Sequence, residues 1–148
     1  MADRYLFKAK RLDWREFPEK EQWIIGYYVL GFDVYEQPVH LIFEPTSMFF
    51  SHGETDGWSE IDPSTLCQCT GLKDKNGKLI WENDVVAYWD AYSTENGQAE
   101  MGCIGKVVWD DETISFQVTN RLSAESYEVL DECVVIGNIF DNPELMYE

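Results

Sequence analysis

The chain has 148 residues, a formal net charge of −17, and hydrophobic and aromatic contents of 45% and 15%. This composition excludes a disordered chain and is sufficient for the core of one domain, or of one domain with a smaller β-rich part. The acidic charge disfavours direct binding to nucleic acid, and the lack of a long apolar run or an export signal predicts a cytoplasmic protein without a membrane partner.

Short segments rich in β-branched and aromatic residues recur along the chain and predict a mainly β protein. The strands are expected at residues 23–30, 40–43, 85–92, 104–109, 113–118 and 134–140. Upstream of them we expect a basic strand with Tyr5, Phe7 and Ala9 toward a core and Lys8 and Lys10 toward solvent. The aromatic side chains of the strands are expected mostly in the core. They are Trp23, Tyr27, Tyr28, Trp81, Tyr88, Trp89, Tyr92 and Trp109.

No stretch of a dozen residues has a helical period, so only short helical turns are expected. Asp62 and Asn142 each precede a proline and are suitable N-caps for two such turns. A third turn is expected within residues 15–22. We expect an N-terminal β-rich segment at residues 1–62, which ends in a long acidic and aromatic loop, and a C-terminal domain at residues 63–148.

The most informative block of the chain is residues 70–86, with the sequence TGLKDKNGKLIWENDVV. Its Asn76-Gly77 pair predicts a hairpin turn, because this dipeptide tolerates the positive φ that a reversal needs. A second polar bend at residues 82–84 leads into the apolar strand that follows. Many SH3-like barrels begin with such a bend, so we expect an SH3-like β-barrel in the C-terminal domain.

Three further stretches of the chain, together with this block, resemble one protein family. They are residues 5–11 with 22–28, residues 61–65 with 68–72, and residues 135–145. With these stretches the chain resembles the YopX family of phage and prophage proteins, although Ala9 and Asn83 stand where we expect glycine. The resemblance implies a mainly β protein with an SH3-like barrel, encoded by a mobile element and located in a bacterial host cell. It brings no established activity and no catalytic residues.

The residues that usually carry chemistry are sparse or uninformative. In a chain with 28 carboxylates an Asp and Glu pair says little, and no nucleophile motif or phosphate-binding glycine loop is present. Cys67 and Cys69 are separated by one residue, which is not the usual zinc spacing, and His40 and His52 are far apart. We therefore expect four reduced, buried thiols, with a metal or redox role as the alternative. The sequence predicts no enzyme, catalytic residue, metal or cofactor.

Large apolar side chains in the loop that precedes the C-terminal domain indicate a surface for another protein. The expected partner-binding residues are aromatic or acidic, namely Phe49, Phe50, Trp58, Glu54, Asp56 and Glu60. The predicted function is that of a non-enzymatic protein-binding module whose partner is a host or phage protein.

The charge distribution suggests two alternatives to this predicted function. An acidic surface would imitate DNA and inhibit a host DNA-handling or defence enzyme, through Asp84, Asp90, Glu95, Glu100, Asp110, Asp111 and Glu112. A basic surface would dock on a neighbouring copy and form a homo-oligomer, through Lys8, Lys10, Arg11, Lys73, Lys75 and Lys78. The simpler interpretation of both sets is solvated surface charge.

Overall fold

The computed structural model describes residues 2–44, 57–122, 126–128 and 132–147. The protein is mainly β, as predicted, with antiparallel strands and short 3-10 turns. The chain divides into two compact units, Met1–Cys69 (unit 1) and Thr70–Glu148 (unit 2). The boundary expected after residue 62 precedes this division. None of the helical turns in the described ranges is long and apolar enough to cross a membrane.

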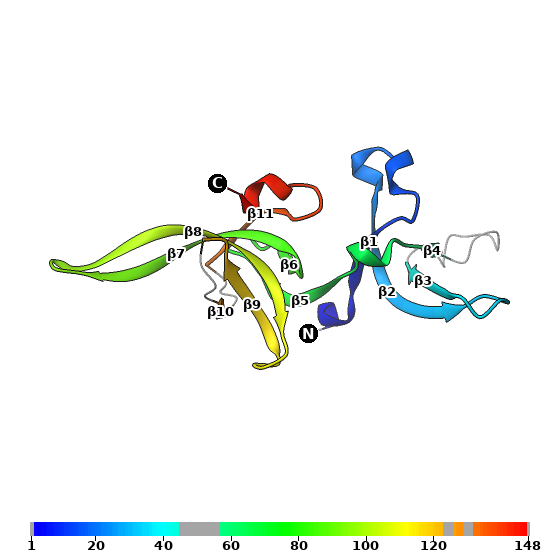
Figure 1. Ribbon diagram of the computed structural model, residues 1–148, viewed down its shortest axis with the longest axis horizontal. Helices are drawn as coiled ribbons and strands as arrows, with labels where there is room; N and C mark the ends of the chain where they lie inside the picture. Colours follow the sequence, from blue (N-terminus) through cyan, green and yellow to red (C-terminus); the bar gives the residue numbers. More distant parts are fainter. Residues whose placement is uncertain (1, 45–56, 123–125, 129–131, 148) are drawn as a thin grey trace. The chain divides into compact units, whose positions relative to one another are not determined.

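Unit 1 is built on an antiparallel sheet in the order β4-β3-β2-β1-β5 (Figure 1). Its strands are β1 (Phe7–Lys10), β2 (Trp23–Phe32), β3 (Pro38–Phe43), β4 (Trp58–Glu60) and β5 (Cys67–Lys73), and β5 continues into unit 2. Its 3-10 turns are η1 (Ala2–Tyr5), η2 (Trp14–Glu16), η3 (Glu19–Glu21) and η4 (Pro63–Thr65). As predicted, Asp62 caps η4, because its side chain accepts a hydrogen bond from the Ser64 backbone N–H at 3.1 Å.

The core of unit 1 lies on one face of this sheet. Ala9, Ile24, Ile42 and Ile61 are buried together. The register of β1, β2 and β3 places the first three on the same side because paired residues of neighbouring strands share a face, and Ile61 follows β4 and bridges to Arg11, the residue after β1. The inward positions of Phe7 and Ala9 are therefore confirmed. Tyr5 instead belongs to η1 and is exposed.

The prediction that Lys10 faces solvent is wrong. Its side chain is only 2% exposed, and Nζ donates a hydrogen bond to Gln22 Oε1 at 3.2 Å. The same ammonium group lies 4.0 Å from the ring centroid of Trp14. The face of β1 opposite the core is thus covered by an aromatic ring, which interacts favourably with a cation and keeps it from water.

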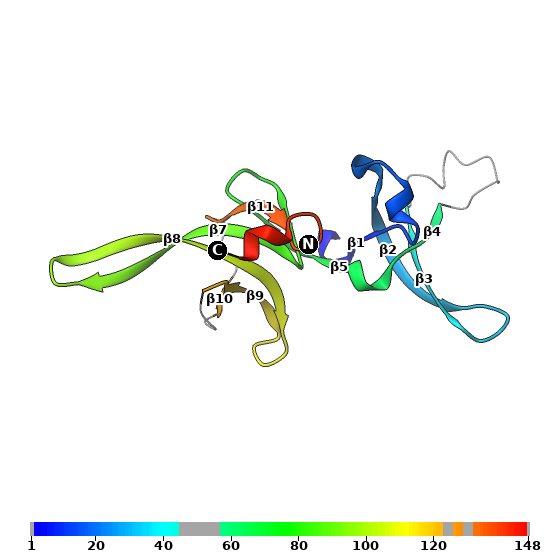
Figure 2. The same ribbon diagram turned by 45° about the horizontal axis from the view of Figure 1, so that its top comes forward.

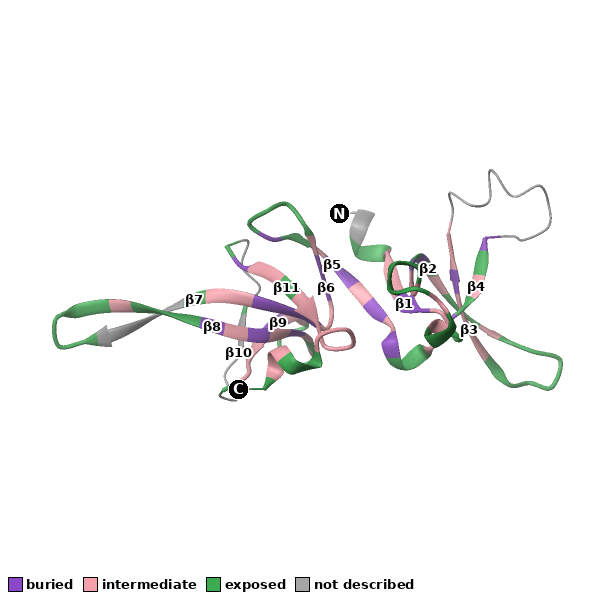
Figure 3. Ribbon diagram, turned by 90° about the horizontal axis from the view of Figure 1, so that it is seen from above, coloured by how far each residue is buried: buried purple, intermediate pink, exposed green. Residues whose placement is uncertain are grey.

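Unit 2 contains an antiparallel sheet in the order β10-β9-β8-β7-β11 (Figure 2). Its elements are β6 (Leu79–Trp81), β7 (Asp84–Thr94), β8 (Gly97–Asp110), β9 (Ser115–Asn120), β10 (Ser126–Glu128), β11 (Val134–Asn138) and the 3-10 turn η5 (Pro143–Met146). Among the described residues the first and last strands of this sheet, β10 and β11, do not pair with each other to close a barrel. The SH3-like barrel therefore stays a prediction. The β7–β8 hairpin is buried near the rest of the sheet and exposed toward its turn (Figure 3).

The core of unit 2 is formed by Ile80, Val86, Val107, Val118 and Cys133. These residues come from four strands and from the segment before β11, so the core depends on strand pairings between distant parts of the chain. The predicted η5 is present, but the side chain of Asn142 does not cap it.

Two glycines of β2 provide a test of how closely strands β2 and β3 approach. A methyl group on Gly26 would overlap the carbonyl oxygen of Phe43, whereas one on Gly31 would find its nearest atom, the Val39 oxygen, at 4.0 Å. We expect Gly26→Ala to lower the free energy of unfolding by about 2 kcal/mol or more through overpacking. Gly31→Ala, the control, should change it by less than about 1 kcal/mol.

Urea unfolding of both variants, followed by circular dichroism, measures this difference. Equal midpoints for Gly26→Ala and Gly31→Ala would contradict the close approach.

Candidate functional site

The part of the chain that the structure describes contains no group of three or more His, Cys, Asp or Glu side chains able to hold a metal ion. The four cysteines are buried and form no disulfide bond, as the sequence predicted. His40 contributes to the fold, because its Nδ1 shares a 2.6 Å hydrogen bond with the Tyr28 hydroxyl. The features that stand out are surfaces, one on each unit.

The first surface is an exposed apolar face on the sheet of unit 1. Ile25, Tyr27 and Val29 alternate along β2 and are exposed, opposite to the side that carries the core. Tyr27 pairs with Phe43, which in turn pairs with Trp58 on β4, so the three rings form one row across the sheet. The rings of Phe43 and Trp58 lie 4.7 Å apart. We call Ile25, Tyr27, Val29, Phe43 and Trp58 the apolar face.

Charged residues border the apolar face on two sides. Lys8 of β1 pairs with Ile25, and its Nζ lies 4.8 Å from the ring centroid of Trp23. On the other side, the exposed Glu60 of β4 pairs with Leu41, the neighbour of Val29 on β3. An apolar centre with a polar rim is the usual arrangement of a protein-binding surface.

The structure brings part of the predicted partner-binding set to this face. Trp58 is 43% exposed and Glu60 lies at its rim. The other predicted members, Phe49, Phe50, Glu54 and Asp56, lie outside the described residues. The sequence analysis missed the contribution of β2, because it assigned the strand aromatics to the core.

Three of those strand aromatics are in fact exposed, namely Tyr27, Trp89 and Trp109. Trp81 is buried as expected, and nothing is described of the Tyr92 side chain. The error has one cause: both faces of the strands in question carry apolar residues, and only one face of each lies against a core.

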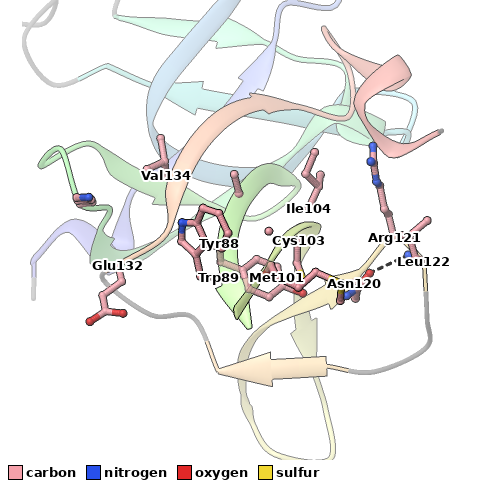
Figure 4. Close-up of a pocket in the computed structure, with 13 residues that line it drawn as sticks. Tyr88, Trp89, Met101, Cys103, Ile104, Asn120, Arg121, Leu122, Glu132 and Val134 are labelled. Atoms are coloured by element: carbon pink, nitrogen blue, oxygen red, sulfur yellow. Dashed lines mark hydrogen bonds between the residues drawn. The ribbon is translucent and has the colours of Figure 1, made fainter. Parts of the chain in front are cut away.

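The second surface is a hollow of about 530 Å³ on unit 2. Its floor follows the strand register: Val134 pairs with Ala87, and Ala87 pairs with Ile104. Trp89 stands in the next row opposite Gly102 and is 70% exposed. Figure 4 shows Val134 and Glu132 toward one end of the hollow and Arg121 and Leu122 toward the other.

Two cations and one carboxylate line this hollow, namely Lys75, Arg121 and Glu132. The Arg121 backbone N–H donates to the Ile104 carbonyl at 3.0 Å, which continues the sheet pairing beyond β9. Its Nη1 donates to the carbonyl oxygens of Leu145 at 2.9 Å and Tyr147 at 3.3 Å. The guanidinium is therefore held in place by the backbone of η5 and the residue after it.

Lys75 is positioned by the buried carboxylate of its neighbour, Asp74. Asp74 Oδ1 accepts backbone hydrogen bonds from Asn76 and Lys78, each at 2.9 Å, and Oδ2 accepts one from Val135 at 2.9 Å. Burial raises the pKa of this carboxyl, but the three N–H donors and the charge of Lys78 together outweigh it and lower the pKa below its ordinary value. The Lys75 N–H of the same turn donates to the carbonyl of Cys133, the residue before β11, at 2.9 Å.

The predicted acidic surface is not gathered in one place. Asp84 is wrong as a surface residue: it is 2% exposed and accepts a hydrogen bond from the Trp81 backbone N–H at 2.9 Å. Glu95 and Glu100 lie at the exposed end of the β7–β8 hairpin, while Asp110, Asp111 and Glu112 surround the turn between β8 and β9. Along β8 the two groups are roughly 30 Å apart at the usual rise of a strand. The side chain of Asp90 is not among those described.

The residues of the predicted basic surface belong to both units. Lys8 borders the apolar face, Lys10 is buried, and Arg11 donates from Nε to the Glu21 carbonyl at 2.9 Å. Lys73, Lys75 and Lys78 are exposed on the β5–β6 turn of unit 2. Of these residues, Lys75 alone contributes to the hollow.

Comparison with known proteins gives a family and a structural likeness. A family model described as YopX protein matches residues 44–147. The chain is also similar to a solved structure, protein EF1440 from Enterococcus faecalis, with 20% sequence identity, coverage of 97% of both chains and a TM-score of 0.45. No curated protein matches the chain. The family match confirms the resemblance that the sequence motifs indicated.

Replacement of Asp74 tests its role in holding the turn that carries Lys75. In Asp74→Asn one acceptor oxygen becomes an NH₂ group that faces a backbone donor, so we expect a loss of about 2 kcal/mol in the free energy of unfolding at pH 7. Because the folded-state pKa of Asp74 is lowered, its stabilising contribution is complete above the unfolded value of about 3.9 and is lost as the pH falls through the folded value.

Urea titrations of wild type and variant between about pH 3 and pH 7 measure this dependence, and their difference should shrink below pH 4. Asp110→Asn is the control, because the Asp110 side chain is partly exposed and, among the described residues, accepts one backbone hydrogen bond, from Glu112 at 2.9 Å. A pH-independent deficit in Asp74→Asn would contradict the assigned role.

Proposed function

Because the chain belongs to the YopX family, which brings no established activity, we propose its function from the surface that its fold leaves open. The protein is a non-enzymatic protein-binding module, and the apolar face of unit 1 is where it contacts its partner. The observation that carries this proposal is the exposure of Ile25, Tyr27 and Val29 at successive outward positions of β2.

An antiparallel sheet with one face in contact with water normally has polar residues at the outward positions. On β2 these positions are apolar, and the paired rings of Phe43 and Trp58 extend them across two further strands. Contiguous exposed apolar residues with a charged rim are typical of protein-binding sites, in which aromatic residues contribute most of the affinity. Lys8 and Glu60 at the rim would select the partner through charge complementarity.

The biological setting of the proposal comes from the family. The protein would act in the cytoplasm of a bacterial cell that carries the phage or prophage, on a host or phage protein. The SH3-like barrel in unit 2 belongs to the same proposal, and it is supported by the bend before β7 and by the position of β7 between β8 and β11.

The proposal predicts that polar replacement on the apolar face removes partner binding and leaves the fold intact. Tyr27→Ser combined with Trp58→Ser removes two exposed rings, 45% and 43% exposed, and we expect at least a tenfold loss of partner recovery, or about 1.4 kcal/mol. The control is Tyr35→Ser, which removes an exposed ring from the β2–β3 turn, away from this face.

The measurement is affinity purification from lysate of the cells that encode the protein, with quantitative mass spectrometry and with thermal unfolding of each variant. A protein retained by wild type and Tyr35→Ser but lost with the double variant supports the proposal. Identical sets of co-purified proteins for wild type and the folded double variant would reject it.

A further inference from the structure

The hollow of unit 2 has the features of a second, independent binding site. The indole of Trp89 lies beside Gly102, where a Cβ atom would be 3.7 and 3.8 Å from two of its ring atoms. Because Gly102 has no side chain, it leaves space along the ring, and Trp89 remains 70% exposed. The half-buried side chains of Ala87, Ile104 and Val134 complete an apolar floor beside this ring.

Arg121 supplies a fixed cationic group at the same site. Its hydrogen bonds to the carbonyls of Leu145 and Tyr147 use Nη1, and within the described ranges Nε and Nη2 donate no hydrogen bond. Those two atoms form the edge of the guanidinium that binds a carboxylate through two parallel hydrogen bonds. Because the backbone already holds the Arg121 guanidinium in place, binding a ligand would cost little of the conformational entropy of this side chain.

The charge of the described residues that line the hollow differs in sign from that of the whole chain. Among them are two cations, Lys75 and Arg121, and one carboxylate, Glu132, whereas the chain as a whole carries −17. The site therefore favours an anionic ligand, while the acidic body repels an extended polyanion such as nucleic acid. An apolar floor with an exposed indole further requires a ligand with an apolar or aromatic part.

We propose that this hollow binds an extended acidic peptide segment of a partner protein, with an aromatic or aliphatic side chain against Trp89 and a neighbouring carboxylate paired with Arg121. The volume of about 530 Å³ accommodates a few residues of such a segment. Lys75 adds a second favourable charge at the rim. This site is separate from the apolar face of unit 1 and does not depend on the function proposed for it.

The test is a selection from a random dodecapeptide display library on the full-length protein. We expect the retained peptides to share an Asp or Glu within a few positions of an aromatic or large aliphatic residue. The consensus peptide, added to ¹⁵N-labelled protein, should shift the NMR signals of the Trp89 indole N–H and of the Gly102 and Arg121 amides.

Three variants locate the interaction. Trp89→Ala removes an exposed side chain and Arg121→Gln removes the fixed cation, and each should weaken the consensus peptide by about tenfold or more. Lys106→Gln, the control, removes one positive charge from β8 outside the hollow and should change the affinity by less than about twofold. Thermal unfolding identifies any variant that is not folded, and Trp89→Ala alone is sufficient if Arg121→Gln is destabilised.

Several results would overturn the proposal. They are a selection without enrichment, a consensus without acidic residues, and equal binding by wild type and folded Trp89→Ala. A further one is self-association of the wild type that Trp89→Ala abolishes, because a second copy would then be the occupant.

Discussion

The carboxylate of Asp74 holds the backbone around the hollow of unit 2 in place. Its three backbone hydrogen bonds join the β5–β6 turn to the start of β11, two segments far apart in sequence. Lys75 at the rim and Val134 in the floor flank these bonds directly. A neutral or longer side chain could not satisfy all three donors from this buried position, so the geometry of the site depends on an ionised aspartate.

In both units the sheet has apolar residues on its two faces, and the two units cover the second face in different ways. A sheet that has apolar residues on both faces needs a layer on each, and one face in each unit has the core. In unit 1 the rings of Trp14 and Trp23 cover the second face around Lys10. In unit 2 the segment around η5 contacts β8 and anchors Arg121. The apolar face and the hollow are the parts of these second faces that remain open.

The features that could be predicted from the sequence are those that residues adjacent in the sequence determine. The Asn76-Gly77 turn forms as expected, with Gly77 at φ 81°. Asn83, where we expected glycine, occupies a left-handed position at φ 70°, which asparagine tolerates. Burial of Lys10 and exposure of Trp89 were not predictable in this way. The first depends on aromatic rings from other elements, and the second on Gly102 lying opposite in the register. The hollow combines residues from Lys75 to Val134, which become neighbours only through strand pairing.

The composition of strand β2 bears on the open face of unit 1. Its ten residues, WIIGYYVLGF, are apolar throughout, which is the composition of a strand covered on both sides rather than of one that faces water. In the described part of unit 1, the core covers Ile24 and Ile42 on one side, while Ile25, Tyr27 and Val29 stay exposed on the other. The uninterrupted run therefore agrees with the proposed function, because a bound partner would form the second layer at the positions where the sheet already aligns Phe43 and Trp58.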